Sequence, residues 1–329
     1  MRAMVVFNPS AGHARQQQDD LTTAARVWIS HGWKVELQPT GAPGDGIRIA
    51  HIAAAERYDL VVAAGGDGTI NEVVNGLAGS TTALAPLPLG TMNVWARELG
   101  LPLQPRAAAE ALLTWQTRII DLGRAGERYF LLMAGIGLDA AITAEVRPDE
   151  KRRLGALAYV LRGLALAVRV RSTRTRLLID GKRSGGRVLM VVIGNSQLYG
   201  GLVKITHRAS VDDGLLDVCV IKGNGFGSAV RHVFSILRRS YSGDPEIEYY
   251  RARSVTVKPH VALPIQVDGD SIGQTPMTFT IAPGALHALM PQHLPDALVQ
   301  QPPIENVRTG RSVQRLLSLL ARQGRLPNK

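Results

Sequence analysis

The sequence has one cysteine, no long apolar run and no N-terminal signal segment. Cys219 is the single cysteine among 329 residues, so a disulfide framework is excluded, which suits a reducing cytoplasm. The apolar run around it, 216–221, predicts a buried strand. The most apolar helical stretch, 154–168, contains Arg162 and is shorter than the roughly 20 residues that span a bilayer. We expect a cytoplasmic protein, free in solution or peripheral at the inner face of the membrane.

Aromatic residues are also scarce, at 5% of the chain, whereas basic side chains are in excess. With 38 Lys and Arg against 27 Asp and Glu, the net charge is +11, and such a field attracts ATP, anionic lipid head groups and nucleic acid. The basic residues are dispersed, and no recognised nucleic-acid-binding module is present. We therefore expect an anionic small molecule or an anionic membrane surface as the partner, and no nucleic acid.

The order of the predicted elements divides the chain into two domains and a tail. Residues 1–120 alternate short apolar runs with helical stretches, which predicts an α/β nucleotide-binding domain with an open, mostly parallel sheet. Residues 121–292 contain many short strands, the last two at 277–281 and 285–290, which predicts a β-rich sandwich. Residues 293–329 form a linker and a tail. Helical insertions in the second domain are expected at 138–146, 154–168 and 226–238.

Residues 60–72 predict a phosphate site. The apolar run 60–64 has the length of a buried strand, and the apolar residues of 70–77 have helical spacing. Between them, three glycines let backbone N–H groups approach an anion at the start of a helix. Asp67 would repel a phosphate unless a cation lies between them, which indicates a nucleotide that arrives with Mg²⁺. The same residues also fit an ordinary turn in which Asp67 caps the helix.

Two further motifs follow apolar strands in the same half of the chain. Asn-Pro-Ser-Ala-Gly at 8–12 ends the first strand, and Pro-Leu-Gly-Thr-Met-Asn-Val-Trp-Ala-Arg at 88–97 ends the fourth. In an open α/β sheet, loops at the carboxyl ends of neighbouring strands converge on one crevice. These two motifs and the glycine-rich segment therefore predict a single nucleotide site.

Two segments of the second domain combine carboxylates with glycine. In Asp268-Gly269-Asp270, the glycine makes a tight turn that can point both carboxylates into a cleft, although an Asp-Gly hairpin turn explains the same residues. In 209–218, adjacent Asp residues lie among other oxygen donors, which suits a hard cation, although an acidic surface turn is the commoner explanation. We expect the catalytic residues to lie in the Asp268-Gly269-Asp270 segment.

Together, these motifs resemble those of the diacylglycerol kinase and sphingosine kinase superfamily, which also includes NAD kinases. The resemblance rests on Gly-Gly-Asp-Gly-Thr with Asn-Glu after it, on the Pro-x-Gly-Thr-x-Asn-x-x-Ala-Arg block, and on Asp-Gly-Asp where the family has Asp-Gly-Glu. It covers the chain up to about Met290 and points to the bacterial YegS-type soluble lipid kinases. It implies ATP-dependent transfer of the γ-phosphoryl group to the hydroxyl of diacylglycerol or a related lipid.

The resemblance also assigns roles to individual residues. Asp268 would be the general base, and Asp270, one methylene shorter than the family's Glu, would position the base or a metal. The residues expected to bind ATP are Asn8, Ser10, Thr40, Gly65, Gly66, Asp67, Gly68, Thr69, Asn71, Glu72, Thr91 and Asn93.

Two Mg²⁺ sites are implied in the same way. Asp67 would engage the catalytic Mg²⁺ that accompanies ATP. A structural Mg²⁺ would be held by the carboxylate of Asp213 and by the backbone oxygens of Ser210 and Leu215.

Several alternatives stay open at this point. An NAD kinase shares the glycine-rich loop, but its acceptor is soluble and Asp67 would then be the base. A catalytically idle nucleotide-binding membrane scaffold is conceivable because Asp270 replaces the family's Glu. The basic amphipathic stretch 308–325 can lie on an anionic bilayer or pack on its own domain. The sequence leaves a homodimer open and does not identify the lipid.

Overall fold

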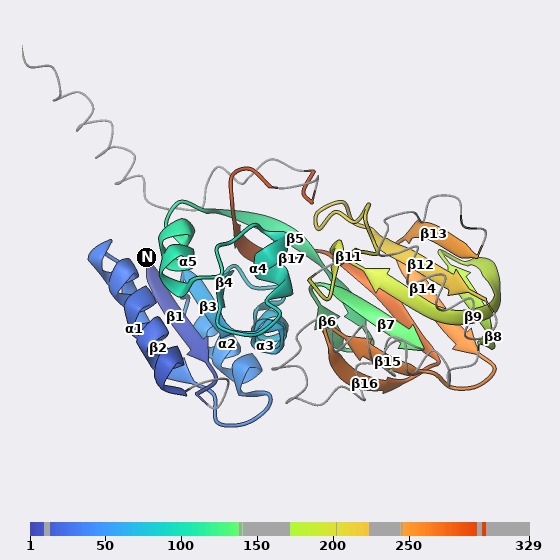
Figure 1. The fold of residues 1–329 in the computed structure, drawn as a ribbon, viewed down its shortest axis with the longest axis horizontal. Coiled ribbons are helices and arrows are strands. Elements are labelled where there is room, and N and C mark those ends of the chain that lie inside the picture. Colours follow the sequence, from blue (N-terminus) through green and yellow to red (C-terminus); the bar gives the residue numbers. More distant parts are fainter. Residues whose placement is uncertain are drawn as a thin grey trace, which may run out of the picture.

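The computed structural model describes residues 1–9, 14–137, 140, 172–201, 203–223, 244, 246–294 and 298–300. Apart from residue 140, the three expected helical insertions lie outside these residues, as do the expected tail helix and Ser10. The described residues form an α/β part and a β-rich part joined by long strands (Figure 1). Among them, no helix is long and apolar enough to cross a bilayer.

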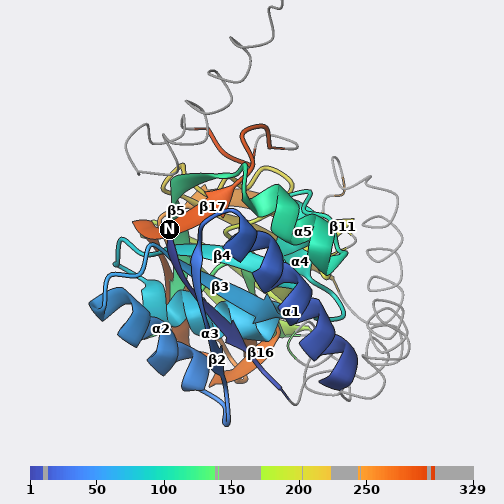
Figure 2. The same ribbon diagram turned by 90° about the vertical axis from the view of Figure 1, so that its left-hand side faces the viewer.

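A parallel sheet forms the core of the first part, in the spatial order β2-β1-β3-β4. Its strands are β1 (Arg2–Phe7), β2 (Lys34–Pro39), β3 (Leu60–Gly65) and β4 (Ala83–Pro88). The helices of this part are α1 (Ala14–Ser30), α2 (Asp45–Ala55), α3 (Asp67–Leu77), α4 (Val94–Glu98) and α5 (Pro105–Leu112). In Figure 2, α1 and α5 lie on one face of the sheet and α2 and α3 on the other. Because helices cover both faces, β3 is buried over its whole length and its sequence is an unbroken apolar run.

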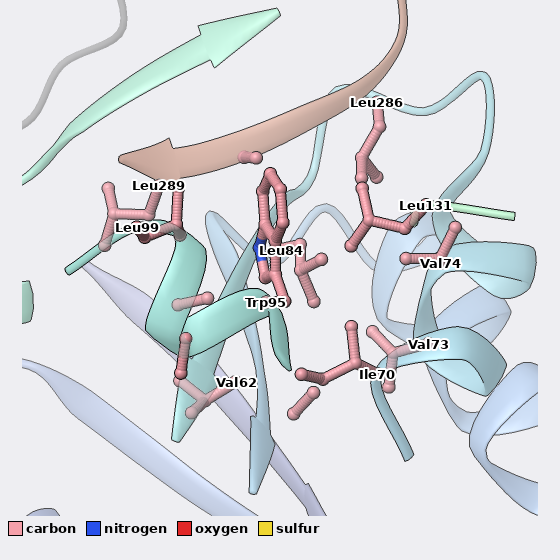
Figure 3. Packing of buried hydrophobic residues seen from close by; sticks show 14 of the residues in the cluster. Val62, Ile70, Val73, Val74, Leu84, Trp95, Leu99, Leu131, Leu286 and Leu289 are labelled. Carbon is pink, nitrogen blue, oxygen red and sulfur yellow. The ribbon is translucent and has the colours of Figure 1, made fainter. Parts of the chain in front are cut away.

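Trp95 of α4 anchors the second glycine-containing block, 88–93, against this sheet. Its side chain is fully buried and packs among apolar residues of α3 and β4, such as Ile70 and Leu84 (Figure 3). The indole therefore fixes α4 in place, so the loop that precedes this helix is held beside the carboxyl end of the sheet.

Two long strands, β5 (Gln116–Ala125) and β17 (Met277–Met290), run from the first part into the second (Figure 1). They pair antiparallel along most of their length, with one register shift. At its end, β17 also joins the parallel sheet beside β4. The strands expected at 277–281 and 285–290 are therefore a single strand, and the boundary expected near residue 120 falls inside β5.

The second part is a β-sandwich with its own apolar core. Its strands are β6 (Arg128–Phe130), β7 (Met133–Gly137), β8 (Thr173–Ile179), β9 (Lys182–Gly194), β10 (Leu198–Tyr199), β11 (Val203–Lys204), β12 (Leu216–Lys222), β13 (Ile247–Ala252), β14 (Ser254–Pro259), β15 (Pro264–Val267) and β16 (Asp270–Gln274). The long β9 pairs with β8 at its start and with β7 and β12 towards its end, so it connects these strands. The expected fold class, a mostly parallel α/β domain and a β-sandwich, is confirmed.

Individual strands confirm or correct the sequence-based expectations. Cys219 is buried in β12, as predicted, and burial raises the pKa of its thiol to about 12. The polar strand β16 is not predicted from its sequence, and it forms by pairing with β15 across a two-residue turn. The strands β6 and β7 are separate, because the chain leaves the ladder at Leu131 and Leu132. The backbone N–H groups of these two residues bind a carboxylate of the candidate site.

Candidate active site

The glycine-rich segment forms the turn between β3 and α3, as the sequence predicts. Gly65 ends β3, and a Cβ at this position would lie 2.4 Å from Oγ1 of Thr69, so a larger residue does not fit. Gly66 caps α3 in an extended conformation. Around Gly68 no atom lies within 4 Å of an added Cβ. The turn therefore leaves the N-terminus of α3 accessible, an arrangement that suits an anion.

The second glycine-containing block contacts this turn directly. A Cβ on Gly90 would lie 2.3 Å from Cα of Gly66, so the two backbones meet at these glycines. The side chain of Asn93 bonds both the N–H and the C=O of Gly90 and shapes the block from within. Thr91, between them, is exposed. The structure thus brings the two predicted nucleotide motifs together.

Asp67 connects the same two motifs. Its Oδ1 accepts a hydrogen bond of 2.8 Å from the N–H of Val94 and a longer one of 3.4 Å from that of Trp95. The carboxylate therefore caps α4, whereas the cap of α3 is Gly66. This contact holds the carboxylate at the start of α3, beside the accessible N–H groups.

The loops that follow β1 and β2 lie side by side at the same edge of the sheet, because the two strands are parallel. The backbone N–H of Thr40 donates to the C=O of Phe7 at 2.8 Å. Asn8 follows Phe7 directly and is half-buried. Asn8 and Thr40 are therefore neighbours at the carboxyl ends of β1 and β2.

Glu72 and Asp45 hold the start of α2. The two carboxylate oxygens of Glu72 accept the N–H groups of Gly44 at 2.9 Å and Gly46 at 2.8 Å. The carboxylate of Asp45 instead accepts two N–H groups of the preceding loop. Glu72 thus satisfies N–H groups that a helix start leaves unpaired, and the nucleotide-binding role expected for it stays a prediction.

The Asp-Gly-Asp segment forms a two-residue hairpin turn between β15 and β16, with Val267 paired to Asp270. Asp268 and Gly269 both have positive φ, 47° and 92°, as a type I′ turn requires. The hairpin explanation and the functional one are therefore compatible, since the turn faces α3 of the first domain.

The carboxylate of Asp268 is saturated with hydrogen bonds. Its Oδ1 accepts from the N–H groups of Leu132 and Met133 at 2.9 and 3.0 Å. Its Oδ2 accepts from the N–H of Leu131 and from Nδ2 of Asn71, both at 2.8 Å. A carboxylate has about four lone-pair sites, and these four donors occupy all of them. Burial raises the pKa of Asp268 to about 6, although these donors favour the ionised form.

Arg128 of β6 links the same turn to α3. Its Nη2 donates to Oδ2 of Asp270 at 2.6 Å and to Oδ1 of Asn71 at 2.7 Å. Asn71 therefore binds Asp268 through its nitrogen and Arg128 through its oxygen. The side chains of Arg128 and Asp270 are 35% and 47% exposed. One hydrogen-bonded set thus joins the helix behind the glycine-rich turn to the Asp-Gly-Asp turn.

The proposed structural metal site does not offer a free carboxylate. Oδ1 of Asp213 accepts the N–H of Leu215 at 3.0 Å, and Oδ2 bonds the guanidinium of Arg251. The hydroxyl of Ser210 donates to Asp212 at 2.9 Å. Arg251 supplies the positive charge that a cation would supply, so the residues as arranged do not fit Mg²⁺ at Asp213. Within the described residues, no group of three or more His, Cys, Asp or Glu side chains could hold a metal ion.

The motifs do not predict Arg128 or Glu98. Buried Glu98, at the end of α4, accepts the N–H groups of Gln197 at 2.6 Å and Leu198 at 3.1 Å, and so joins the two domains. Burial raises the pKa of Glu98. Both residues lie in stretches of mixed polarity, where a charged side chain usually marks a solvated face. Asn71 contacts Asp268 and Arg128, and the ATP-binding role expected for it stays a prediction.

Comparison with known proteins gives the family. Residues 2–125 match the diacylglycerol kinase catalytic domain, and residues 133–290 match the YegS C-terminal NAD kinase beta sandwich-like domain. A diacylglycerol kinase of Bacillus subtilis is 31% identical over 300 residues, which cover 90% of this chain and 99% of the relative. A Pseudomonas putida protein named a probable lipid kinase, YegS-like, is 35% identical over 297 residues, 89% of this chain and 97% of the relative.

A solved structure is similar over both domains. The crystal structure of a diacylglycerol kinase from Bacillus anthracis matches with a TM-score of 0.72 and 25% identity, covering 88% of this chain and 96% of that one. The first matched family segment contains the glycine-rich turn, and the second contains the Asp-Gly-Asp turn. The chain therefore belongs to the bacterial YegS-type lipid kinase family, and it is a kinase.

Proposed function

We propose that this kinase transfers the γ-phosphoryl group of ATP to the hydroxyl of a membrane lipid, diacylglycerol or a related one. The observation that carries the proposal is the bonded set of Asn71 with Asp268 and Arg128 with Asp270, which joins the two motif-bearing turns. Phosphoryl transfer requires mainly that donor and acceptor be positioned and that charge be neutralised. The names of the relatives supply the acceptor class, because they are lipid or diacylglycerol kinases.

The nucleotide would bind at the carboxyl ends of the parallel strands. The glycine-rich turn and the N-terminus of α3 would receive the phosphates, with Asn8, Thr40 and Thr91 on the neighbouring loops. Mg²⁺, when bound with ATP, would neutralise phosphate charge. Asp67 is the residue that would hold it, because a carboxylate is a hard oxygen donor and this one lies at the start of α3.

We assign the base role to Asp270 and a positioning role to Asp268. Asp268 would have to give up one of four N–H donors to accept a proton, whereas Asp270 is partly exposed and bonded to Arg128. In the proposed step, the Asp270 carboxylate takes the proton of the lipid hydroxyl. The hydroxyl oxygen then bonds the γ-phosphorus, the bond to the β–γ bridging oxygen breaks, and ADP leaves. Arg128 supplies positive charge beside the transferred group.

The test uses the purified full chain, γ-labelled ATP and a total lipid extract, with the labelled product identified. We expect a labelled lipid from the parent. Asp270→Asn should lower kcat by about 10²–10⁴-fold while the melting temperature is unchanged. Asp268→Asn should lower the melting temperature as well, because an amide cannot accept four N–H groups.

Three outcomes would contradict parts of this scheme. Near-parental turnover by Asp270→Asn would remove Asp270 from the base role. If the label appeared in added NAD and not in a lipid, the acceptor would be a soluble molecule and not a membrane lipid. No labelled product of either kind would indicate a nucleotide-binding scaffold.

A further inference from the structure

In the described part of the β-sandwich, four neighbouring strands carry basic side chains and no acidic ones. The strands β8, β9, β14 and β17, which are neighbours in the sheet, contain six Lys and Arg residues and no Asp or Glu. Five of these side chains share the outer face, which we call the basic sheet face. Its members are Arg174, Arg176, Arg183, Arg187 and Lys258.

The strand register places these residues together. Arg174 pairs with Arg187 across β8 and β9, and Arg176 pairs with Lys258 across β8 and β14. Paired residues point to the same side of a sheet. All four are exposed, whereas the alternating residues of the same strands, such as Leu177, are buried in the sandwich core.

Most of this charge has no carboxylate beside it. Arg174, Arg176, Arg183 and Lys258 form no ion pair with any residue that the structure describes. The nearest acid in sequence, Asp180 of the turn between β8 and β9, uses its carboxylate to accept backbone N–H groups of the β13–β14 turn. Like charges placed directly opposite on a sheet destabilise it, so an external anion would relieve the repulsion.

We propose that the basic sheet face docks this kinase on an anionic lipid bilayer. The inference rests on the proposed function, because an enzyme whose acceptor is a membrane lipid must reach the bilayer. Each Lys or Arg near an anionic surface contributes about 1 kcal/mol of binding, so five on one face suffice for reversible attachment.

An exposed apolar side chain at the edge of the face favours a bilayer over nucleic acid. Val261, in the loop that follows β14, is 62% exposed. This loop adjoins the basic sheet face, because the N–H of His260 donates to the C=O of Arg174 at 2.8 Å. An interface between head groups and acyl chains accepts such a side chain. No aromatic side chain points outward from β8 or β14, although stacking on aromatic residues is a common device for binding single strands.

The face also continues towards the candidate active site. Thr280 of β17 pairs with Arg124 of β5, which pairs with Tyr129 of β6. The residue before Tyr129 is Arg128, whose guanidinium bonds Asp270. Docking through this side would therefore bring the bilayer surface towards the β5–β6 hairpin, in which Arg128 points to the opposite side of the strand from Tyr129.

The test compares two triple charge reversals in the full chain. The face variant is Arg174→Glu, Arg176→Glu and Lys258→Glu, and the control is Arg26→Glu, Lys34→Glu and Arg106→Glu, exposed residues of the first domain. Each replacement changes the charge by two, so both variants go from +11 to +5. Flotation with equimolar phosphatidylglycerol and phosphatidylcholine vesicles should show at least about 100-fold weaker binding of the face variant. The control should bind like the parent.

Parallel measurements separate this inference from the proposed function. Phosphorylation of a water-soluble short-chain diacylglycerol should be the same in parent and face variant, since that acceptor needs no docking. Equal vesicle binding by the face variant and the control variant would overturn the proposal, because another segment would then bind the membrane. If the face variant lost binding to a single-stranded oligonucleotide but kept vesicle binding, the basic sheet face would be a nucleic-acid-binding surface and the proposal would be overturned. A parent that binds vesicles but labels no lipid would contradict only the proposed function.

Discussion

The side-chain amide of Asn71 donates a hydrogen bond of 2.8 Å to the carboxylate of Asp268, although 197 positions separate the two residues in the chain. Asn71 is almost fully buried in α3, directly behind the glycine-rich turn, and Asp268 opens the turn that carries Asp270. This contact, together with the bond from Arg128 to Asn71, is where the two domains set the relative position of their motifs.

Asn71→Ala tests whether this contact positions the turn. The substitution removes the bonds to Asp268 and Arg128, and hydrogen bonds to charged groups are each worth about 1.5–3 kcal/mol. We expect the free energy of unfolding to fall by about 3 kcal/mol or more in urea titrations and kcat to fall at least about tenfold. Asn75→Ala is the control, because Asn75 bonds the backbone of Tyr129 at the same interface but neither carboxylate. If both variants lose stability and neither loses kcat, the Asn71 contact is purely structural.

Gly90 and Gly68 should respond to alanine in opposite ways. A Cβ on Gly90 would lie 2.3 Å from the backbone of Gly66. Gly90→Ala should therefore push the two glycine-containing segments apart and lower the free energy of unfolding by about 2 kcal/mol or more. Gly68→Ala has free space in the first turn of α3 and should retain or slightly raise the melting temperature. Calorimetric ATP titration should nevertheless show weaker binding by Gly68→Ala, because the new methyl group stands where phosphates would approach. Unchanged ATP affinity would place the nucleotide elsewhere.

Glu98 should behave as a connection between the domains. Glu98→Ala leaves the buried N–H groups of Gln197 and Leu198 without their acceptor, and unsatisfied buried donors cost about 1–3 kcal/mol each. We expect a melting temperature lower by about 10 °C or more in thermal unfolding followed by circular dichroism. Glu98→Gln retains one acceptor oxygen and should recover part of the loss. Equal losses for Gln and Ala would mean that the charge of Glu98, and not its hydrogen bonding, is the important property.

Arg251 and Mg²⁺ should compete for Asp213. In the structure the guanidinium engages this carboxylate, so the melting temperature of the parent should not depend on millimolar Mg²⁺ in the absence of ATP. Arg251→Ala frees the carboxylate, and its melting temperature should rise when Mg²⁺ is added. Asp213→Asn in the same background should abolish that rise. A parent that is itself stabilised by Mg²⁺ would show that the arginine moves aside for the cation.

Asp217 should make stability depend on pH in the mildly acidic range. It is fully buried in β12, and burial raises the pKa of its carboxyl to about 6, although the hydroxyl of Tyr249 donates to it at 2.7 Å. The folded chain therefore binds this proton more tightly than the unfolded chain, whose Asp titrates near pH ~4. The stability from the protonated group is complete below about pH 4 and is lost as the pH rises through about 6.

Comparison with Asp217→Asn isolates that contribution. The difference in free energy of unfolding between parent and variant should change by about 3 kcal/mol between pH 4 and pH 7. Urea titrations at each pH provide the measurement, and the subtraction removes the contributions of other carboxylates. A difference that is constant with pH would mean that Tyr249 and Arg251 fully offset the effect of burial.

The amino-acid sequence by itself determined the local parts of this protein. Strand, glycine turn and helix at 60–77 follow from an apolar run, residues with little steric bulk and helical spacing, all of which act within a few residues. The parallel sheet and the convergence of the glycine blocks follow from the same short-range rules, because parallel strands end at one edge. The hairpin at Asp268-Gly269 is likewise predicted by its two residues.

Only the tertiary structure decided which carboxylate is available. Asp268 is saturated because Leu131, 137 positions away, and its neighbours turn their N–H groups towards it, and no local pattern records that pairing. The same holds for Arg128, which reaches Asp270 only because β6 lies beside α3. Hydrogen-bond donors and acceptors are saturable and directional, so the role of a charged side chain depends on the partners that the fold brings to it.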